Sequence, residues 1–320
     1  MVVTVIERLR GGKAVVLDGA NGTELEERGA PQTSDAAWAD CSATHPEIVR
    51  AVHEDYIRAG ADIITTNTYS TGAHVLRTMG RDEVIAPWNR ASVDIARNAI
   101  NNTARGREVL VAGSASPFGN GAMRYPSMDG AFTWGEDDPN LLAANYREQI
   151  GHLVEAGIDL ILLEFLAGTA ADIEIGVAVA REFDRPVVAS LSATIDDQGT
   201  AILTSISEAS EVTLGHETVT DTVQRIAGSG VDAIYAMHSE IDEIDAILAA
   251  IRAAWHGPLG AYPNRTGYCD GSQWVFTEQV TPQGYAARVQ RWTELGATMI
   301  GGGGGTTPAM IEAVAGTLKH

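Results

Sequence analysis

The sequence is short of cysteine and of positive charge. Only Cys41 and Cys269 occur in 320 residues, far apart in the chain, so no disulfide framework is indicated and a reducing cytoplasm is the expected compartment. Lys and Arg number 22 against 42 Asp and Glu, which leaves a formal net charge of −20, and no Lys/Arg-rich run occurs. Nucleic acid and anionic membrane surfaces are therefore not expected as partners.

Long apolar runs are also missing. The first 19 residues carry Glu7, Arg8 and Arg10 where a secretory signal would need an apolar segment, and no run reaches transmembrane length. We therefore expect neither a signal peptide nor a membrane span.

Short runs rich in Val, Ile, Leu and Ala are present, and they alternate with amphipathic stretches, as is typical of βα units around a parallel sheet. They predict strands at 14–19, 62–69, 109–116, 159–165, 186–193, 231–239, 258–264 and 297–303. Helices are predicted at stretches such as 45–60, 140–157, 169–183 and 281–296. Four helices run into strands through similar junctions, "AGAD", "AGID", "SGVD" and "LGAT".

Eight such units predict an α/β fold, a single (β/α)8 TIM barrel that forms one domain over residues 1–320. The longest insertion, residues 117–139, follows the third strand and carries Tyr125 and Trp134. Because the loops that follow barrel strands line the carboxyl face, we expect this insertion to lie over the mouth of the barrel.

The predicted strands end in polar residues, which is where a TIM barrel places its chemistry. Asp18 and Glu164 each follow an apolar run, and the sixth strand ends near His238. Two carboxylates at one mouth would be stabilised by a cationic ligand group. The alternative is that each carboxylate caps a helix or bonds nearby backbone amides.

Five consecutive glycines, residues 301–305, follow the last predicted strand and precede Thr306, Thr307 and Pro308. Glycine amides that lead into a helix can form a phosphate cradle. The nearest basic residue after them is Lys319, which weakens this interpretation.

Several blocks together resemble one family. They are "DGANGTELEERG" (18–29), "HPEIVRAVHEDYIRAGADIITTNTY" (45–69), "LILLEF" (160–165), "AYPN" (261–264) and "GGGGGTTPAMI" (301–311). In this order and spacing they resemble the homocysteine S-methyltransferases. The resemblance implies a TIM barrel in which three cysteine thiolates hold zinc, and zinc-bound homocysteine sulfur attacks an onium or folate methyl group.

The resemblance also implies roles for individual residues. Asp18 and Glu164 match the positions that grip the substrate ammonium group, and Gly19 with Thr66, Asn67 and Thr68 match those that hold its amino-acid backbone. Trp38 matches an aromatic position near the mouth, and Asn264 belongs to the matched "AYPN" block, which we include among the substrate-binding candidates.

The three zinc ligands are not retained. The first cysteine position holds His238, and the paired cysteines fall at Gly303 and Gly304, so the glycine run resembles a cysteine pair replaced by glycine. We therefore expect no cofactor. Zinc would require a rebuilt site, for which His238, Cys269 and Asp270 are the conceivable ligands.

These observations predict a homocysteine S-methyltransferase-like enzyme. It would bind an amino-acid-like substrate at the mouth and take a methyl group from a small onium donor boxed by aromatics such as Trp38, Trp134 or Trp274. His238 and Glu164 are the catalytic candidates. The alternatives are a hydrolase or lyase in which His238 acts as base, and a non-catalytic amino-acid-binding protein.

Overall fold

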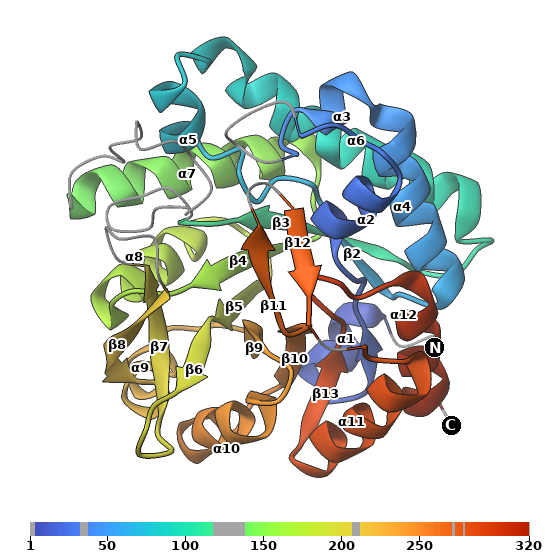
Figure 1. Ribbon diagram of the computed structural model, residues 1–320. Coiled ribbons are helices and arrows are strands. Elements are labelled where there is room, and N and C mark those ends of the chain that lie inside the picture. Colours follow the sequence, from blue (N-terminus) through green and yellow to red (C-terminus); the bar gives the residue numbers. More distant parts are fainter. Residues whose placement is uncertain are drawn as a thin grey trace.

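A computed structural model describes residues 4–32, 38–117, 138–206, 212–270, 273–277 and 279–319. Eight parallel strands form one sheet in the order β1, β13, β10, β9, β5, β4, β3, β2 (Figure 1). A parallel bridge between Leu17 and Ile63 joins the two end strands and closes the sheet. The predicted TIM barrel is confirmed, and the division into one domain over 1–320 stays a prediction.

Each of the eight predicted strands is present. They are β1 (Val15–Val16), β2 (Ile63–Thr65), β3 (Leu110–Ala115), β4 (Leu160–Leu166), β5 (Val187–Leu191), β9 (Ala233–Glu240), β10 (Leu259–Asn264) and β13 (Ala297–Ile300). The prediction extended the last strand to residue 303, but the ladder ends at Ile300, because the following glycine amides bond to other segments.

Helices form an outer ring around the sheet (Figure 1). They are α4 (Pro46–Ala59), α6 (Ile85–Thr103), α7 (Pro139–Ala156), α8 (Ala170–Ala180), α9 (Val219–Ile226), α10 (Ile244–Ala254), α11 (Pro282–Glu294) and α12 (Pro308–Leu318). The four predicted helical stretches correspond to α4, α7, α8 and α11. Gly60 and Gly157 end α4 and α7 with φ of 108° and 94°, the left-handed conformation that glycine adopts without a steric cost.

Shorter helices surround the start of the chain and the β2 loop: α1 (Val5–Arg10), α2 (Asn21–Glu27), α3 (Cys41–Thr44), α5 (Ala73–Thr78) and the 3-10 helix η1 (Asp82–Val84). Val5 and Leu9 of α1 belong to the same buried cluster as Leu17, Tyr235 and Met299 from the barrel interior. The first helix therefore closes the amino end of the barrel, opposite the mouth.

The similar junctions "AGAD", "AGID" and "SGVD" share a structural role. Asp62, Asp159 and Asp232 precede β2, β4 and β9, and each carboxylate accepts the backbone N–H of a residue on the neighbouring strand, at 3.1, 2.7 and 2.9 Å. Arginines pair with all three carboxylates. The fourth junction has Thr298 instead, whose buried Oγ1 has no partner.

Two small sheets were not predicted. After β5, the strands β6 (Ala193–Ile195), β7 (Ala201–Ile206) and β8 (Val212–Thr218) form an antiparallel sheet. After β10, β11 (Gly267–Asp270) pairs with β12 (Gln273–Phe276). Both follow carboxyl ends of barrel strands, where loops carry function. Most of the predicted mouth insertion, with Tyr125 and Trp134, lies outside the described residues.

The apolar side chains divide into an interior and an exterior core. The barrel interior holds Val15, Leu17, Ile63, Leu110, Ala112, Leu160, Leu162, Val188, Tyr235, Met237, Tyr262 and Met299. A larger cluster fills the layer between the strands and the helices. None of the described helices is long and apolar enough to cross a membrane.

Candidate functional site

The predicted acidic residue of the first strand is enclosed by its neighbours. Asp18 is fully buried, and its carboxylate accepts Thr65 N–H at 2.6 Å, Thr65 Oγ1–H at 3.0 Å and Tyr262 O–H at 3.3 Å. Burial raises the pKa of Asp18 to about 7, against the lowering effect of these hydrogen bonds. Asp18 therefore bonds a nearby backbone amide, as the alternative interpretation of the carboxylates expects.

Glu164 and His238 are brought together. His238 Nε2 lies 3.0 Å from Glu164 Oε1, and Ser114 Oγ donates to Glu164 Oε2. With an ionised Glu164, which can only accept, the bonded imidazole nitrogen carries the proton, and Nδ1 of a neutral ring keeps its lone pair. The side chain of His238 is 20% exposed and that of Glu164 is 11% exposed, so both can be reached from the mouth.

Irregular backbone positions this pair. Phe165 and His238 have φ of 60° and 53°, a left-handed conformation that costs a non-glycine residue about 1–3 kcal/mol. The β4–β5 register shifts between Leu163 and Leu166, and the β9–β10 register shifts beside His238. Such bulges re-aim side chains at the ends of strands.

Aromatic rings surround the imidazole. The ring centroid of His238 lies 5.5 Å from that of Tyr69 and 5.2 Å from that of Phe165, the latter edge to face. The two rings limit the directions from which a ligand can approach His238. They give the mouth a partly apolar wall.

The glycine run has no free amide. Its five N–H groups bond Ala261 O, Asp18 O, Pro263 O, Asn264 Oδ1 and Thr23 Oγ1, at 3.1, 3.1, 2.8, 2.8 and 3.1 Å in chain order. A phosphate cradle requires amides that point at the ligand. The phosphate alternative therefore has no donor set in this segment.

Close packing accounts for the glycine at 303 but not for that at 304. A β-carbon on Gly303 would lie 2.1 Å from Asn264 Oδ1. A side chain at this position would therefore have to displace the Asn264 carboxamide. On Gly304 the nearest atoms would be 3.6 Å away, an ordinary contact. Neither residue has a left-handed φ, whereas Gly305 does.

The residues at the three matched positions do not fit a thiolate zinc site. His238 Nε2 is bonded to Glu164, positions 303 and 304 have no side chain, and Asn264 Oδ1 already accepts Gly304 N–H. Within the described ranges, no group of three or more His, Cys, Asp or Glu could hold a metal ion. The side chains of Cys269 and Asp270, unlike their backbone in β11, are not described, so the rebuilt-site alternative and the absence of zinc both stay predictions.

The threonines expected to contact substrate hold strands together. Thr66 Oγ1 and Thr68 Oγ1 are 2.7 Å apart, Thr66 accepts Ser114 N–H at 3.1 Å, and Thr68 donates to Ser114 O at 2.7 Å. These buried bonds join the end of β2 to β3.

Asn67, Trp38 and Gly19 also build the rim of the mouth. Asn67 Nδ2 donates to Trp38 O at 2.8 Å, and the Trp38 ring packs on Gly22. The carbonyl of Gly19 accepts Tyr262 O–H at 2.9 Å. Their contact with substrate stays a prediction. The side chain of Trp274 is not among those that the structure describes.

Sequence reasoning missed Ser114, Thr65 and Phe165. All three lie within or at the end of apolar strand runs, where alternation offers the only sign that Ser114 faces the barrel interior. The bond from Ser114 to Glu164 depends on neighbouring strands, which a single run of residues does not reveal.

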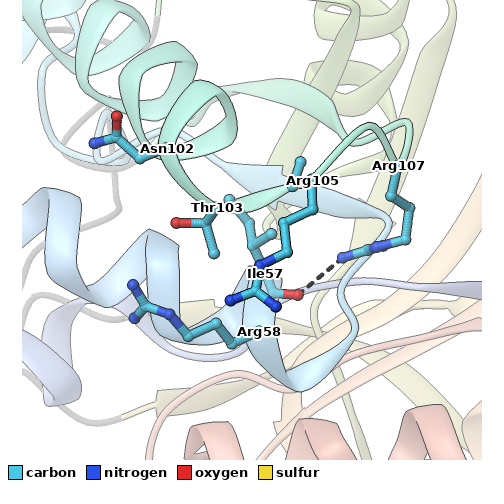
Figure 2. Close-up of a pocket in the computed structure, with 7 residues that line it drawn as sticks. Ile57, Arg58, Asn102, Thr103, Arg105 and Arg107 are labelled. Atoms are coloured by element: carbon cyan, nitrogen blue, oxygen red, sulfur yellow. Dashed lines mark hydrogen bonds between the residues drawn. The ribbon is translucent and has the colours of Figure 1, made fainter.

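A separate cavity of about 410 Å³ lies between the carboxyl-terminal part of α4 and the residues at the end of α6 and just after it (Figure 2). It is lined by Ile57, Arg58, Asn102, Thr103, Ala104, Arg105 and Arg107. Arg107 donates to Ile57 O at 2.8 Å and to Asp62 at 3.1 Å, so it serves the helix end and the strand junction. This cavity is opposite the mouth and contains none of the predicted site residues.

Comparison with known proteins identifies the class. The family model described as homocysteine S-methyltransferase matches residues 15–318. Maize homocysteine S-methyltransferase 4 is 30% identical, with 98% of this chain and 91% of that protein covered. Homocysteine S-methyltransferase YbgG of Bacillus subtilis is 26% identical over 94% of this chain and 93% of that protein.

A solved structure agrees. The metallated form of the homocysteine methyltransferase MmuM from Escherichia coli superimposes with a TM-score of 0.73 at 26% identity, covering 97% of this chain and 99% of that one. The fold and these comparisons agree on a TIM barrel of the methyltransferase class. The chain belongs to the homocysteine S-methyltransferase family.

The two glycines make a matched test of the packing. Gly303→Ala should lower the free energy of unfolding by about 1–3 kcal/mol, because its methyl group overlaps the Asn264 carboxamide. Gly304→Ala should change it by less than about 0.5 kcal/mol. Urea denaturation measures both, and equal effects would contradict the assigned packing.

Asp18 should make stability depend on pH. Because its folded pKa is raised to about 7, the stability it contributes is fully present below its unfolded pKa and is lost as pH rises through the folded pKa. The unfolded pKa is about 4. Relative to Asp18→Asn, the wild type should therefore lose unfolding free energy between about pH 4 and pH 7.5. A difference that stays constant across this range in denaturation experiments would refute the assignment.

Proposed function

We propose that the chain, acting as one domain over residues 1–320, methylates a small amino-acid-like acceptor at the barrel mouth. The methyl group would come from a small onium donor, without a three-thiolate zinc site. The observation that carries this proposal is the 3.0 Å contact between His238 and Glu164 at the position where the family resemblance places a zinc ligand.

His238 supplies the proton acceptor in this proposal. Glu164 fixes the ring so that Nε2 holds a proton, and no described group bonds Nδ1. A thiol has a pKa of about 8.5, so it is mostly protonated at neutral pH and reacts poorly. As the acceptor sulfur forms its bond to the methyl carbon, its proton passes to Nδ1. The carbon–onium bond breaks, and the donor leaves as a neutral sulfide or amine.

The carboxylates supply recognition. Asp18 and Glu164 lie at the ends of β1 and β4, close enough for the charge of Glu164 to contribute to the raised pKa of Asp18. An ammonium group placed between them would offset that repulsion and favour the ionised form of Asp18. Each carboxylate oxygen has a second lone pair, so its existing bonds leave room for another donor.

The surrounding residues complete the proposed substrate shell. Gly19, Trp38, Thr66, Asn67, Thr68 and Asn264 line or support the rim of the mouth. Tyr69 and Phe165 join them, because their rings stand beside the proposed base. An aromatic wall also suits an onium donor, since the face of a ring attracts a cation.

The same base could activate water instead, which would make the enzyme a hydrolase or lyase on an amino-acid or onium substrate. A non-catalytic amino-acid binder would need no base at all. Methyl transfer and hydrolysis give different products from one mixture, and a binder gives none, so a single assay separates the three functions.

The assay incubates the protein with homocysteine and a panel of sulfonium and quaternary ammonium methyl donors, and detects products by mass. We expect a methylated thiol, with kcat lowered about 10²–10⁴-fold in His238→Gln and also lowered in Glu164→Gln. His256→Gln, on the exposed surface, is the control. Donor cleavage without thiol methylation would favour the hydrolase, and binding without turnover would favour the binder.

Recognition of the ammonium group is tested by binding alone. Asp18→Asn and Glu164→Gln should each weaken amino-acid binding by about 1.5–3 kcal/mol, the scale of a charged hydrogen bond. Calorimetry with homocysteine and with its analogue lacking the amino group measures this. Wild-type affinity in both variants, or equal affinity for the two ligands, would remove the carboxylates from the recognition shell.

A further inference from the structure

The hydroxyl groups of Thr66 and Thr68 form an oriented network beneath the mouth. Both residues are buried, at 2% and 0% exposed. Thr68 Oγ1 donates its single proton to Ser114 O at 2.7 Å. Thr66 is therefore the donor in the 2.7 Å bond between the two threonine hydroxyls, and it accepts Ser114 N–H at 3.1 Å. The two threonines thus hold both polar groups of the Ser114 backbone.

This backbone places the Ser114 side chain beside Glu164. Ala112 of β3 and Leu162 of β4 belong to the buried cluster of the barrel interior, and Ser114 pairs in register with Leu162. Because side chains alternate along a strand, Ser114 and Glu164, each two residues further on, also face the interior. Ser114 is fully buried, and its hydroxyl donates to Glu164 Oε2. The carboxylate is therefore bonded at both oxygens, to Ser114 at Oε2 and to His238 at Oε1.

Two bonds fix the plane of the Glu164 carboxylate. The last torsion of a glutamate side chain has a broad energy profile, so a bond at Oε1 alone would leave the group able to turn. The bond from Ser114 holds Oε1 toward His238 Nε2 and so keeps the ring proton on that nitrogen. Nδ1 then has the lone pair that the proposed reaction requires.

We propose that Ser114 is a positioning residue: it orients Glu164, and through Glu164 it selects the tautomer of His238. Thr66 and Thr68 act one step further out, by holding Ser114, rather than by contact with the substrate. The effect on rate rests on the proposed function. The orientation itself exists without substrate and is measured separately.

Nitrogen NMR of protein with isotopically labelled histidine tests the orientation. Signals that disappear in His238→Gln belong to His238. In weakly alkaline buffer, we expect wild type to carry the proton on Nε2 and Ser114→Ala to show a mixture of both tautomers, because the carboxylate can turn away. Ser190→Ala is the matched control: it removes another buried hydroxyl, which donates to Leu163 O at 2.5 Å, and should keep the wild-type signals. Wild-type signals in Ser114→Ala would overturn the proposal.

The rate effect is measured in the methyl-transfer assay. Ser114→Ala should lower kcat about 10- to 100-fold, the scale on which a misplaced group slows a reaction. The KM of the methyl donor should change by less than about twofold, because the lost bond does not contact the donor. Ser190→Ala should retain the wild-type kcat. An unchanged kcat in Ser114→Ala, or an equal loss in both variants, would contradict the positioning role. Absence of methyl transfer in wild type would refute the proposed function and leave the NMR result standing.

A second pair of variants tests the threonines and decides the matter if Ser114→Ala does not fold. Thr66→Val keeps the shape of the side chain but removes the hydroxyl, and should give the mixture of His238 tautomers. Thr66→Ser keeps the hydroxyl and should show the wild-type signals. Calorimetry with homocysteine measures the alternative. Weaker binding in Thr66→Val with unchanged His238 signals would mean that Thr66 contacts the substrate directly, and it would overturn the role assigned here.

Discussion

Closure of the barrel between β1 and β2 depends on two buried aspartates. The two strands share one isolated bridge. Backbone bonds from Asp62 N–H to Val16 O at 2.7 Å and from Asp18 N–H to Ile63 O at 3.0 Å also cross the seam. The carboxylates of the same two aspartates add further bonds: Asp62 accepts Val16 N–H near the amino end, and Asp18 accepts Thr65 N–H near the mouth. Three basic side chains, Arg8, Arg107 and Lys319, surround Asp62, whereas Asp18 is bonded by uncharged donors of Thr65 and Tyr262 among the described residues. One end of the seam is therefore a neutralised structural joint. The other end, near the mouth, holds the Asp18 carboxylate through uncharged donors.

The mouth also contains the bonded pair Glu164 and His238. The family pattern has a cysteine at the position of His238, so it does not contain this pair. At the positions where the resemblance implies zinc thiolates, this chain has an imidazole, a blocked glycine and an open glycine. The imidazole is bonded to a glutamate that the resemblance assigns to the substrate ammonium. The change at one position therefore alters the environment of another, because Glu164 bonds His238 here, and under the proposed function it would also bind the ammonium group. The proposed acceptor would have to suit that shared arrangement.

The strands, the main helices and the candidate residues at strand ends were predictable, because apolar runs and helical periodicity follow directly from burial. The small sheet β6–β8 was not, since its strands are short and part of their pattern is polar. The contact between Glu164 and His238 was also beyond sequence reasoning. It requires two left-handed residues and two register shifts on strands that are separated by β5, and none of these has a signature in either strand alone. The role of Gly303 was similarly hidden, because its neighbour Asn264 lies 39 residues earlier in the chain.

The left-handed conformations of Phe165 and His238 set a limit on how stable this protein can become. Glycine or asparagine would adopt the same backbone at lower cost, so selection for thermal resistance alone would favour losing both rings. The aromatic edge and the imidazole would disappear with them. Under the proposed function, these two residues would hold the base in place at the cost of a less stable backbone, a compromise between durability and activity.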